Sequence, residues 1–317
     1  MKVFLTGITG NLGYEVGLAL PKRSMSVVPC VRKEKVEEVR AYPISYSGVA
    51  LCDLLSDDEI TYSDRVDCIV HCAGIVHFRD AGIKNETMAL KVASFARGRG
   101  IPVYFASTAF LYRPPAADAP FRNAYEEDKH RAEEVIRASG VPHAVLRPSV
   151  LSGSTQDGRL RNYSGYYLLA KAFLEAAGAA KAQGRALRFP NMGGHSDLVP
   201  VDQVATHITD RVEAGRLGMS YITNPDPPAA NWLLAETLDY FGIADTVDIV
   251  DVPFDDFATL ALTEEEARLY TFASHFSPYW TMTYRFPDSV CTENLIDRAY
   301  LTRTLEAFAK DTQHGYA

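Results

Sequence analysis

The first half of the chain alternates short apolar runs with longer segments in which apolar residues recur at helical spacing. The short runs predict strands at Val3–Leu5, Met25–Val31, Gly48–Leu51, Cys68–His71, Val103–Ala106 and Ala144–Leu146. The longer segments predict helices at about Leu12–Leu20, Lys33–Arg40, Ile83–Arg97 and Ala124–Ala138. Strands that alternate with helices pair in parallel and are covered on both faces. The pattern therefore predicts an α/β fold, a Rossmann-type doubly wound parallel sheet.

The pattern changes after Leu151. Glycine, asparagine and aromatic residues become frequent between Ser152 and Tyr167, and Pro- and Gly-rich stretches follow at Phe189–Gly194 and Asn224–Pro228. Helices are predicted for an Ala-rich segment that ends near Gln183 and for Asp202–Glu213, Ala230–Phe241, Glu264–His275 and Glu293–Lys310. We expect a sheet domain over residues 1–150. We expect a smaller, mostly helical substrate-binding subdomain over residues 151–317, with some chain crossing back to the sheet.

The composition of the 317-residue chain is that of an ordinary globular protein, with 47% hydrophobic and 23% charged residues. The formal net charge is −8 and the basic residues form no long run, which argues against nucleic acid or an anionic membrane as the main partner. No segment approaches the roughly 18 apolar residues of a membrane span, and no signal-peptide stretch precedes Val3. We therefore expect no nucleic-acid partner and no membrane span.

The five cysteines are scattered along the chain. Cys68 and Cys72 are four residues apart, but no second pair or histidine cluster completes a zinc pattern. Their neighbours are apolar, which favours buried free thiols. Free thiols fit a reducing compartment, so we expect a cytoplasmic protein without a metal site.

A glycine-rich turn, Thr6-Gly7-Ile8-Thr9-Gly10-Asn11-Leu12-Gly13, lies between the first predicted strand and the first predicted helix. Gly7 permits a tight turn, Gly10 lets the backbone approach a pyrophosphate, and Gly13 allows close helix–strand packing. A strand before the motif and a helix after it are the context that dinucleotide binding requires. The alternative is a tight turn with no ligand.

The end of the second strand indicates which dinucleotide is bound. NAD-binding units usually have an acidic residue there, whereas a basic residue meets the 2′-phosphate of NADP. This strand ends with Arg32, which can bind a phosphate bidentately, and Glu34 comes too late in the chain to hold the ribose. The prediction is NADP(H), and the alternative is that Arg32 only faces solvent. Asp53, after the third strand, is interpreted either as a hydrogen-bond acceptor for adenine or as a turn cap.

Tyr125 and Lys129 lie one helical turn apart on the same predicted helix. Reduction of a carbonyl by hydride needs a proton donor, and a free tyrosine with a pKa near 10 is a poor one. A neighbouring ammonium lowers that pKa, and Lys129 can also bind the nicotinamide ribose. Ser107-Thr108, at the end of the fifth strand, supplies hydroxyls that can hold the carbonyl oxygen. The alternative is a Tyr and a Lys on a helix surface.

Over essentially its full length the chain resembles an extended, or atypical, short-chain dehydrogenase/reductase. The matching segments are Thr6–Gly13, Asp53-Leu54, His71–Gly74, Ser107–Tyr112, Tyr125…Lys129 with Ala132-Glu133, and Leu146–Val150 with Gly153. The resemblance implies a catalytic set of Thr108, Tyr125 and Lys129, with Ser107 in support, and Asn85 aligns with the Asn of the family's tetrad. The cofactor is expected at Gly7, Thr9, Gly10, Asn11, Leu12, Arg32, Asp53, Leu54, Cys72, Ala73, Gly74, Lys129, Pro148 and Val150. His71 itself is interpreted as a packed strand residue.

A narrower resemblance concerns the substrate. Cys30-Val31-Arg32, His71–Val76, Leu198–Ala205 and Tyr221–Pro225 are similar to thioester reductase domains and fatty acyl-CoA reductases. Those enzymes use NADPH to reduce an acyl thioester to an aldehyde and sometimes to an alcohol. The resemblance implies an acyl-thioester or other small carbonyl substrate and an acyl carrier protein supplied in trans. Similar segments occur in reductases of free aldehydes and ketones, which stays an alternative.

Two hypotheses from other classes remain open. An NAD-dependent sugar-nucleotide epimerase or dehydratase uses the same core with tightly held NAD, and Arg32 argues against it. A non-catalytic NADP-binding protein usually lacks the Tyr or the Lys, and both are present here.

Several residues of the second half have two interpretations. Tyr163, Tyr166 and Tyr167 line an acyl pocket or pack a helix, and His195 and Asp197 touch substrate or lie in a solvated loop. The Phe276–Phe286 stretch belongs to the core of the small subdomain or covers the substrate cleft.

Overall fold

The computed structural model describes residues 1–57, 59–76, 78, 82–113, 121–287, 289–291 and 293–313. These residues form two compact units. The first unit contains Met1–Leu151, Pro200–Thr223 and Phe286–Val290. The second contains Ser152–Val199, Asn224–Arg285 and Cys291–Ala317. Two segments from the second half of the chain therefore belong to the unit that the N-terminal half builds.

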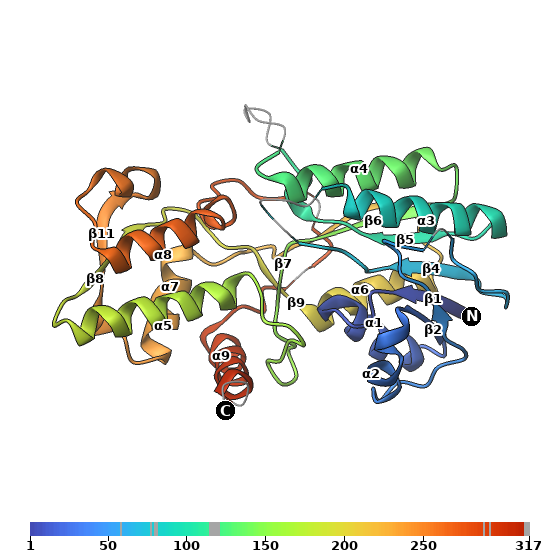
Figure 1. The fold of residues 1–317 in the computed structure, drawn as a ribbon, viewed down its shortest axis with the longest axis horizontal. Coiled ribbons are helices and arrows are strands. Elements are labelled where there is room, and N and C mark those ends of the chain that lie inside the picture. Colours follow the sequence, from blue (N-terminus) through green and yellow to red (C-terminus); the bar gives the residue numbers. More distant parts are fainter. Residues whose placement is uncertain are drawn as a thin grey trace. The chain divides into compact units, whose positions relative to one another are not determined.

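The first unit is built on a seven-stranded parallel sheet with the strand order β10-β6-β5-β4-β1-β2-β3 (Figure 1). Its strands are β1 Lys2–Thr6, β2 Ser26–Val31, β3 Ala50–Leu51, β4 Cys68–His71, β5 Val103–Ala106, β6 His143–Pro148 and β10 Gly218–Ile222. All of the neighbouring strands pair in parallel. The predicted doubly wound Rossmann-type sheet is confirmed, with β10 as a seventh strand that the apolar pattern did not reveal.

Helices cover both faces of this sheet, α3 and α4 on one face and α1 and α6 on the other (Figure 1). The helices of the first unit are α1 Asn11–Lys22, α2 Val36–Arg40, α3 Lys84–Arg99, α4 Ala124–Ala138 and α6 Val201–Glu213. The segment predicted as one helix at Lys33–Arg40 is a 3₁₀ turn, Lys33–Lys35, followed by the short α2. Asp202 lies in the first turn of α6, where an acidic residue stabilises the helix.

The core beneath α3 and α4 fixes these two helices on the sheet. Phe4, Ile69 and Phe105 from three strands pack with Val92 of α3 and Ile136 of α4, and all five side chains are fully buried. Burial of each such side chain contributes about 1.5–3 kcal/mol. Consecutive strand residues such as Val3, Phe4 and Leu5 are all buried, because helices cover the sheet on both sides.

A buried ion pair joins α4 to the carboxyl end of β6. Both carboxylate oxygens of Glu133 accept hydrogen bonds from Arg147, at 2.8 Å from Nε and 2.7 Å from Nη2. Arg147 also donates to the hydroxyl of Tyr221 on β10, at 2.6 Å. The ring of Phe286 stacks on Tyr221 with centroids 6.2 Å apart. These contacts therefore link α4, β6 and β10 to one another, and they attach Phe286 to β10.

The second unit has four α-helices, three short 3₁₀ helices and a pair of parallel strands among its described residues. The helices are α5 Tyr166–Ala182, α7 Ala230–Tyr240, α8 Glu264–Ser274 and α9 Arg298–Gln313, and β8 Leu187–Asn191 pairs with β11 Val247–Pro253. The short strands β7 Val150–Ser152 and β9 Leu198–Pro200 lie where the sequence passes from one unit to the other. The predicted mostly helical C-terminal region is confirmed, although β8 and β11 were not predicted. Their pairing joins segments about 60 residues apart, which a local pattern does not show.

The last helix begins at Arg298 and not at the predicted Glu293. The carboxylate of Asp297 accepts a hydrogen bond of 2.7 Å from the backbone N–H of Tyr300, and the amide oxygen of Asn294 accepts one from Ile296. These two side chains hold the chain in turns before the helix, as capping residues do.

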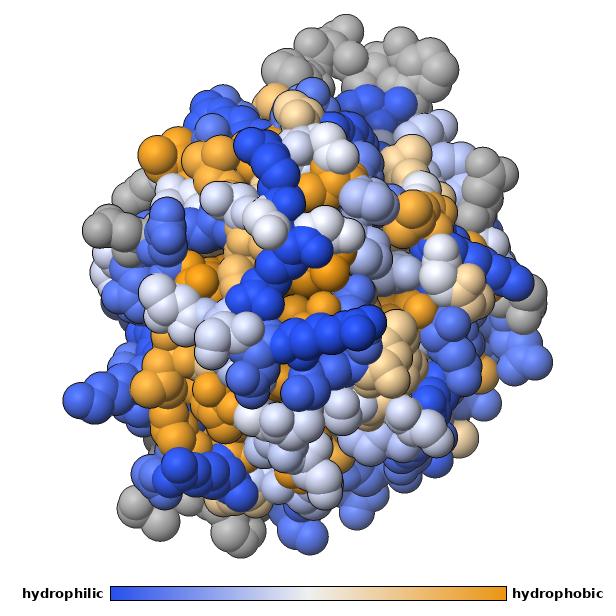
Figure 2. All heavy atoms as spheres, turned by 90° about the vertical axis from the view of Figure 1, so that its right-hand side faces the viewer, coloured by the Kyte–Doolittle hydropathy of each residue, from blue (hydrophilic) through white to orange (hydrophobic). Residues whose placement is uncertain are grey.

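The surface is mixed in character. Figure 2 shows hydrophilic side chains with smaller groups of apolar ones between them, on the face that lies at the right of Figure 1. Such a mixture is normal for a protein exterior. Among the residues that the structure describes, no helix has both the length and the apolar character needed to cross a membrane.

Candidate active site

The glycine-rich turn after β1 packs directly against the segment that follows β4. Gly7 has a φ of +76°, and a Cβ atom at this position would lie 2.4 Å from the backbone nitrogen of Ala73. A Cβ on Gly13 would lie 2.1 Å from the carbonyl oxygen of Gly7. Gly13 therefore allows the start of α1, which packs on β1 and β2, to approach the Gly7–Ile8 backbone of the turn closely. At Gly10 the nearest atom would be 3.4 Å away, so this position keeps the open approach that a pyrophosphate needs.

The end of β4 forms a buried hydrogen-bonded chain. The backbone N–H of Ala73 donates to Thr6 Oγ1 at 3.2 Å, and Thr6 Oγ1 lies 2.6 Å from His71 Nδ1. Since Thr6 accepts from Ala73, its own proton is free to go to Nδ1, which requires a neutral imidazole. Burial lowers the pKa of His71 to about 3, and the nearby Lys129 adds to this effect. His71 is thus a packed strand residue, and it supports the segment at Cys72 and Ala73.

Helix α4 places Tyr125 in its first turn and Lys129 one turn later. Asn123 caps the helix by accepting a hydrogen bond from the backbone N–H of Glu126 at 3.0 Å. Lys129 is 4% exposed and its ammonium donates to the carbonyl oxygen of Ala106 at 2.9 Å. The same ammonium lies 4.9 Å from the centroid of the Phe105 ring. Burial lowers the pKa of Lys129 to about 8.

Desolvation raises the pKa of Tyr125, and the nearby Thr108 hydroxyl lowers it by less. The net pKa of Tyr125 is above its ordinary value, and the neighbouring carboxylates of Glu126 and Asp128 contribute to the increase. Lys129 is not among the groups that shift the pKa of Tyr125. The lowering of that pKa by the Lys129 ammonium stays a prediction. Thr108 is buried and also accepts a hydrogen bond from the backbone N–H of Phe110, at 3.4 Å.

Gly74 lies beside Lys129. A Cβ atom on Gly74 would lie 3.2 Å from Lys129 Nζ and 3.3 Å from Asn85 Oδ1. The backbone at Gly74 is exposed, whereas the ammonium beneath it is buried. A side chain at this position would fill the space next to the ammonium, so the glycine keeps this space open for a ligand.

The buried carboxylate of Glu126 was missed in the sequence. Glu126 forms ion pairs with both Arg113 and Arg122, and both arginines also donate to the carbonyl oxygen of Phe110. These contacts hold the Phe110 segment, just after Thr108, against the start of α4. In the sequence Glu126 looks like a common acidic residue of a helix first turn. The only signal in the sequence for a buried ion pair was the presence of two arginines near Glu126 in the chain, Arg113 and Arg122.

The residues expected near the adenosine lie further along the sheet, after β2 and β3. The Arg32 side chain is 51% exposed, and its Nε lies 3.3 Å from a carboxylate oxygen of Glu34. Asp53 accepts a hydrogen bond from the backbone N–H of Leu55 at 2.9 Å, so it caps a turn, and this bond lowers the pKa of Asp53. Leu54 is buried in the core beneath α3 and α4. An adenine contact of Asp53 stays a prediction.

The remaining predicted residues have ordinary positions. Thr9, Asn11 and Leu12 belong to the glycine-rich turn and the start of α1, and Pro148 and Val150 end β6 and begin β7. In the second unit, the Tyr166 hydroxyl lies 2.6 Å from Thr237 Oγ1, and Tyr167 is fully buried with its hydroxyl bonded to the backbone N–H of Gly153. These two tyrosines pack a helix and do not line an open pocket.

The other aromatic and loop residues of the second half pack in a similar way. The hydroxyl of Tyr163 donates to Asp311 at 3.0 Å. Tyr279 and Trp280 are buried in the second unit, whereas Phe286 belongs to the first. Asp197 is 2% exposed and accepts a hydrogen bond from the backbone N–H of Asn224, so it is not part of a solvated loop.

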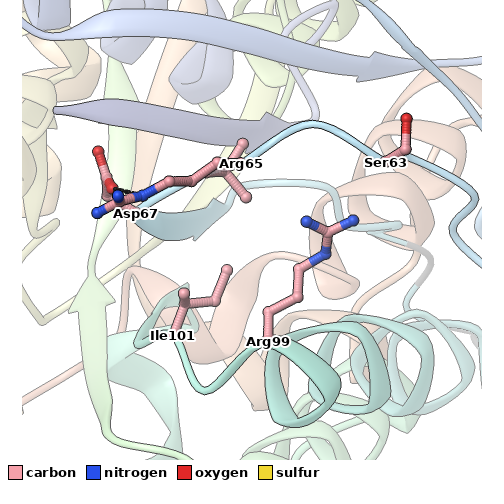
Figure 3. Close-up of a pocket in the computed structure, with 6 residues that line it drawn as sticks. Ser63, Arg65, Asp67, Arg99 and Ile101 are labelled. Carbon is pink, nitrogen blue, oxygen red and sulfur yellow. Dashed lines mark hydrogen bonds and ion pairs between the residues drawn. The ribbon is translucent and has the colours of Figure 1, made fainter.

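A surface pocket of about 540 Å³ lies at the opposite edge of the sheet, at the amino ends of β4 and β5 (Figure 3). Asp67 in this pocket pairs with Arg65 and accepts a hydrogen bond from the backbone of Lys2, at the start of β1. These groups are engaged with one another, and none of the predicted catalytic residues lies there. Within the described part of the chain, no group of three His, Cys, Asp or Glu residues is arranged to hold a metal ion.

The candidate residues fit a dinucleotide in three respects. Gly10 leaves open space at the start of α1, and Gly74 leaves space above the Lys129 ammonium. The hydroxyl of Ser107 is buried, and it has no hydrogen-bond partner among the described residues. An orphaned buried hydroxyl costs free energy unless a ligand engages it.

Comparison with known sequences gives one family. The profile described as "NAD dependent epimerase/dehydratase family" matches residues 3–210. This range contains the glycine-rich turn, Thr108, Tyr125 and Lys129. A comparison with curated protein sequences finds no match.

Solved structures share the fold. The terminal R domain from the myxalamid PKS-NRPS biosynthetic pathway is 19% identical with a TM-score of 0.70, over 98% of this chain and 91% of that one. A thiolation-reductase di-domain from an archaeal non-ribosomal peptide synthetase is 18% identical with a TM-score of 0.67, over 98% and 76%. The Bordetella bronchiseptica enzyme WbmG, in complex with NAD, is 17% identical with a TM-score of 0.62, over 98% and 94%. At these identities the likeness shows the fold alone.

The buried His71 predicts an acid-sensitive fold. Above pH 6.5 the imidazole is neutral in the folded and the unfolded chain. Between pH 6.5 and about 3 the unfolded chain binds a proton that the folded chain does not, so stability falls as the pH falls. Replacing His71 with Gln removes this loss, which is on the order of 4 kcal/mol over the whole interval. Urea unfolding at several pH values measures it, with His275→Gln, at a partly exposed position, as the control. Parallel pH curves for wild type and His71→Gln would contradict the assignment.

Proposed function

Because the chain belongs to the NAD dependent epimerase/dehydratase family, we propose that it is an NADPH-dependent reductase of an acyl thioester. The observation that carries the proposal is the closeness of the Thr108 and Tyr125 hydroxyls, one helical turn from the buried ammonium of Lys129. Two hydroxyls that meet in this way can both reach one carbonyl oxygen.

Because its pKa is raised, Tyr125 keeps its proton at neutral pH, and an alkoxide is basic enough to take that proton. A tyrosine that stays protonated at neutral pH is a proton donor for the alkoxide that forms when hydride reaches a carbonyl carbon. NADPH supplies that hydride when it is bound. In the proposed site Thr108 holds the carbonyl oxygen, Tyr125 gives it the proton, and Lys129 holds the cofactor ribose and keeps a positive charge near the oxygen. The hemithioacetal formed from a thioester then releases a thiol and leaves an aldehyde.

The thioester substrate is supported by two likenesses. The Leu198–Ala205 and Tyr221–Pro225 segments resemble those of thioester reductases, and the R domain and the thiolation-reductase di-domain share the fold over 98% of this chain. We propose that the acyl group arrives on coenzyme A or on a carrier protein supplied in trans, and that residues 151–317 contribute to its binding. Free aldehydes and ketones are the alternative substrates within the same chemistry.

A sugar-nucleotide epimerase or dehydratase is the second candidate, because the family description names epimerases and dehydratases and the similar structure of WbmG holds NAD. Such an enzyme holds NAD and regenerates it in each turnover. Arg32 at the end of β2 favours NADP(H), although Glu34 lies 3.3 Å from its guanidinium and must give way to a 2′-phosphate.

Replacement of Tyr125 with Phe tests the proposed chemistry. We expect kcat for NADPH oxidation with acyl-CoA or acyl-pantetheine to fall by about 10²- to 10⁴-fold, because the proton donor is lost. NADPH absorbance at 340 nm follows the reaction, with free aldehydes, ketones and sugar nucleotides as further substrates and Tyr104→Phe, a buried strand tyrosine, as the control. Full activity of Tyr125→Phe would refute the mechanism. Turnover of sugar nucleotides without net NADPH oxidation would favour the epimerase.

Replacement of Arg32 with Ala tests the choice of cofactor. The dissociation constant of NADPH is expected to rise by about tenfold, since one charge-assisted phosphate contact is lost, and that of NADH is expected to stay within about twofold. Titration of protein fluorescence measures both, with Lys33→Ala as the neighbouring control. Equal weakening of both nucleotides, or of neither, would show that Arg32 does not read the 2′-phosphate.

A further inference from the structure

The side chain of Asp128, which precedes Lys129 in α4, is fully buried. Its carboxylate accepts three hydrogen bonds from the first turn of α3: 2.8 Å from the Asn85 backbone N–H, 2.7 Å from Asn85 Nδ2 and 3.1 Å from the Glu86 backbone N–H. A buried carboxylate is costly without such donors, and the amino end of a helix stabilises it further. Asp128 is therefore anchored to α3.

The side-chain amide of Asn85 links Asp128 to the backbone that follows β4. Asn85 is 2% exposed. Its Oδ1 accepts from the backbone N–H of Ile75 at 3.0 Å, and its Nδ2 donates to the carbonyl oxygen of Ile75 at 3.0 Å and to Asp128. One side chain thus pairs with both polar groups of the Ile75 backbone. The amide has only two N–H donors, so both are in use.

Ile75 directly follows Gly74, whose backbone covers the ammonium of Lys129. A Cβ atom on Gly74 would lie 3.2 Å from Lys129 Nζ and 3.3 Å from Asn85 Oδ1. Asp128 precedes Lys129 on α4, and hydrogen bonds lead from Asp128 through Asn85 to Ile75. The backbone next to the ammonium is therefore tied to the helix that carries the ammonium. The space beside the ammonium depends on the position of the Gly74–Ile75 backbone.

We propose that Asp128 and Asn85 act as a clamp that positions the Gly74–Ile75 backbone over Lys129, and that this clamp shapes the place where the cofactor ribose binds. The inference deepens the proposed reductase function and rests on it. Both residues are positioning residues, since their polar groups are engaged with each other and with backbone. Asn85, which aligns with the Asn of the family's tetrad, acts here through its side-chain amide on Ile75.

The clamp also has an electrostatic effect on Lys129. Burial lowers the pKa of Lys129, and the charged or ionisable groups that raise it are Cys72 after β4 and Glu133 and Asp128 on α4. His71, also near the ammonium, is held neutral by burial. Loss of the Asp128 charge is therefore expected to lower the pKa of Lys129 further. The alkaline limb of the activity, where Lys129 loses its proton, then moves to lower pH.

Three variants of the full chain separate the clamp from ordinary helix stability. Asp128→Asn places an amide N–H against the N–H donors of α3, and Asn85→Ala removes both bonds to Ile75 while it leaves the Asp128 charge. Val92→Ala, in the core between α3 and α4, is the matched control that weakens packing without touching the clamp. The measurements are the dissociation constant of NADPH without substrate, and the pH dependence of kcat/KM.

Asp128→Asn and Asn85→Ala are expected to raise the dissociation constant of NADPH by about tenfold, because the site is no longer preorganised, and Val92→Ala is expected to change it by less than about twofold. Only Asp128→Asn is expected to shift the alkaline limb to lower pH. The proposal is overturned if Asp128→Asn and Asn85→Ala both bind NADPH as tightly as Val92→Ala does. If Asp128→Asn does not fold, the comparison of Asn85→Ala with Val92→Ala alone tests the proposal. If the wild type binds NADPH but reduces no carbonyl, the proposed function is refuted. The dissociation constants of NADPH for the variants still test the clamp in that case.

Discussion

The first unit keeps a lysine ammonium almost out of water, and the candidate chemistry depends on this burial. Lys129 is 4% exposed, donates to the Ala106 carbonyl and lies over the Phe105 ring. The free energy of desolvation is large for a cation, and it lowers the pKa of Lys129 to about 8. The site therefore needs rigid support from both sides of α4. Asp128 and Asn85 give it toward α3, and Glu133 and Arg147 give it toward β6.

Desolvation also shifts the pKa of Tyr125, and it therefore bears on the proposed roles of Tyr125 and Lys129. Desolvation raises the pKa of the half-buried Tyr125, so the hydroxyl keeps its proton at neutral pH and can give it to an alkoxide. The Thr108 hydroxyl lies close to that of Tyr125, and Glu126 with its two arginines holds the segment after Thr108 in place. In the proposed site the Lys129 ammonium holds the cofactor more than it ionises the tyrosine.

Much of the first unit could be predicted from the sequence, because its strands and helices have strong local patterns. Cys68–His71, Val103–Ala106 and Ala124–Ala138 were predicted with the bounds that the structure has. Strand β10 and the parallel pair β8–β11 could not be, since their partners are distant in the chain. The glycine turn, the Tyr125–Lys129 pair and the hydroxyls of Ser107-Thr108 were predicted from residue chemistry and spacing, and the choice of Thr108 came from the family resemblance. Glu126 and Asp128 were missed, because an acidic residue in an early helix turn looks solvated until its buried partners are known.

The central claim is that hydride passes from NADPH to a carbonyl carbon beside Tyr125. The most direct test uses NADPH that carries deuterium at C4 of the nicotinamide, in either configuration, with an acyl thioester as the substrate. Mass spectrometry should find one deuterium at the former carbonyl carbon of the aldehyde, from one of the two configurations. Oxidation of NADPH without label in the organic product, or conversion of a sugar nucleotide with no net consumption of cofactor, would contradict the claim.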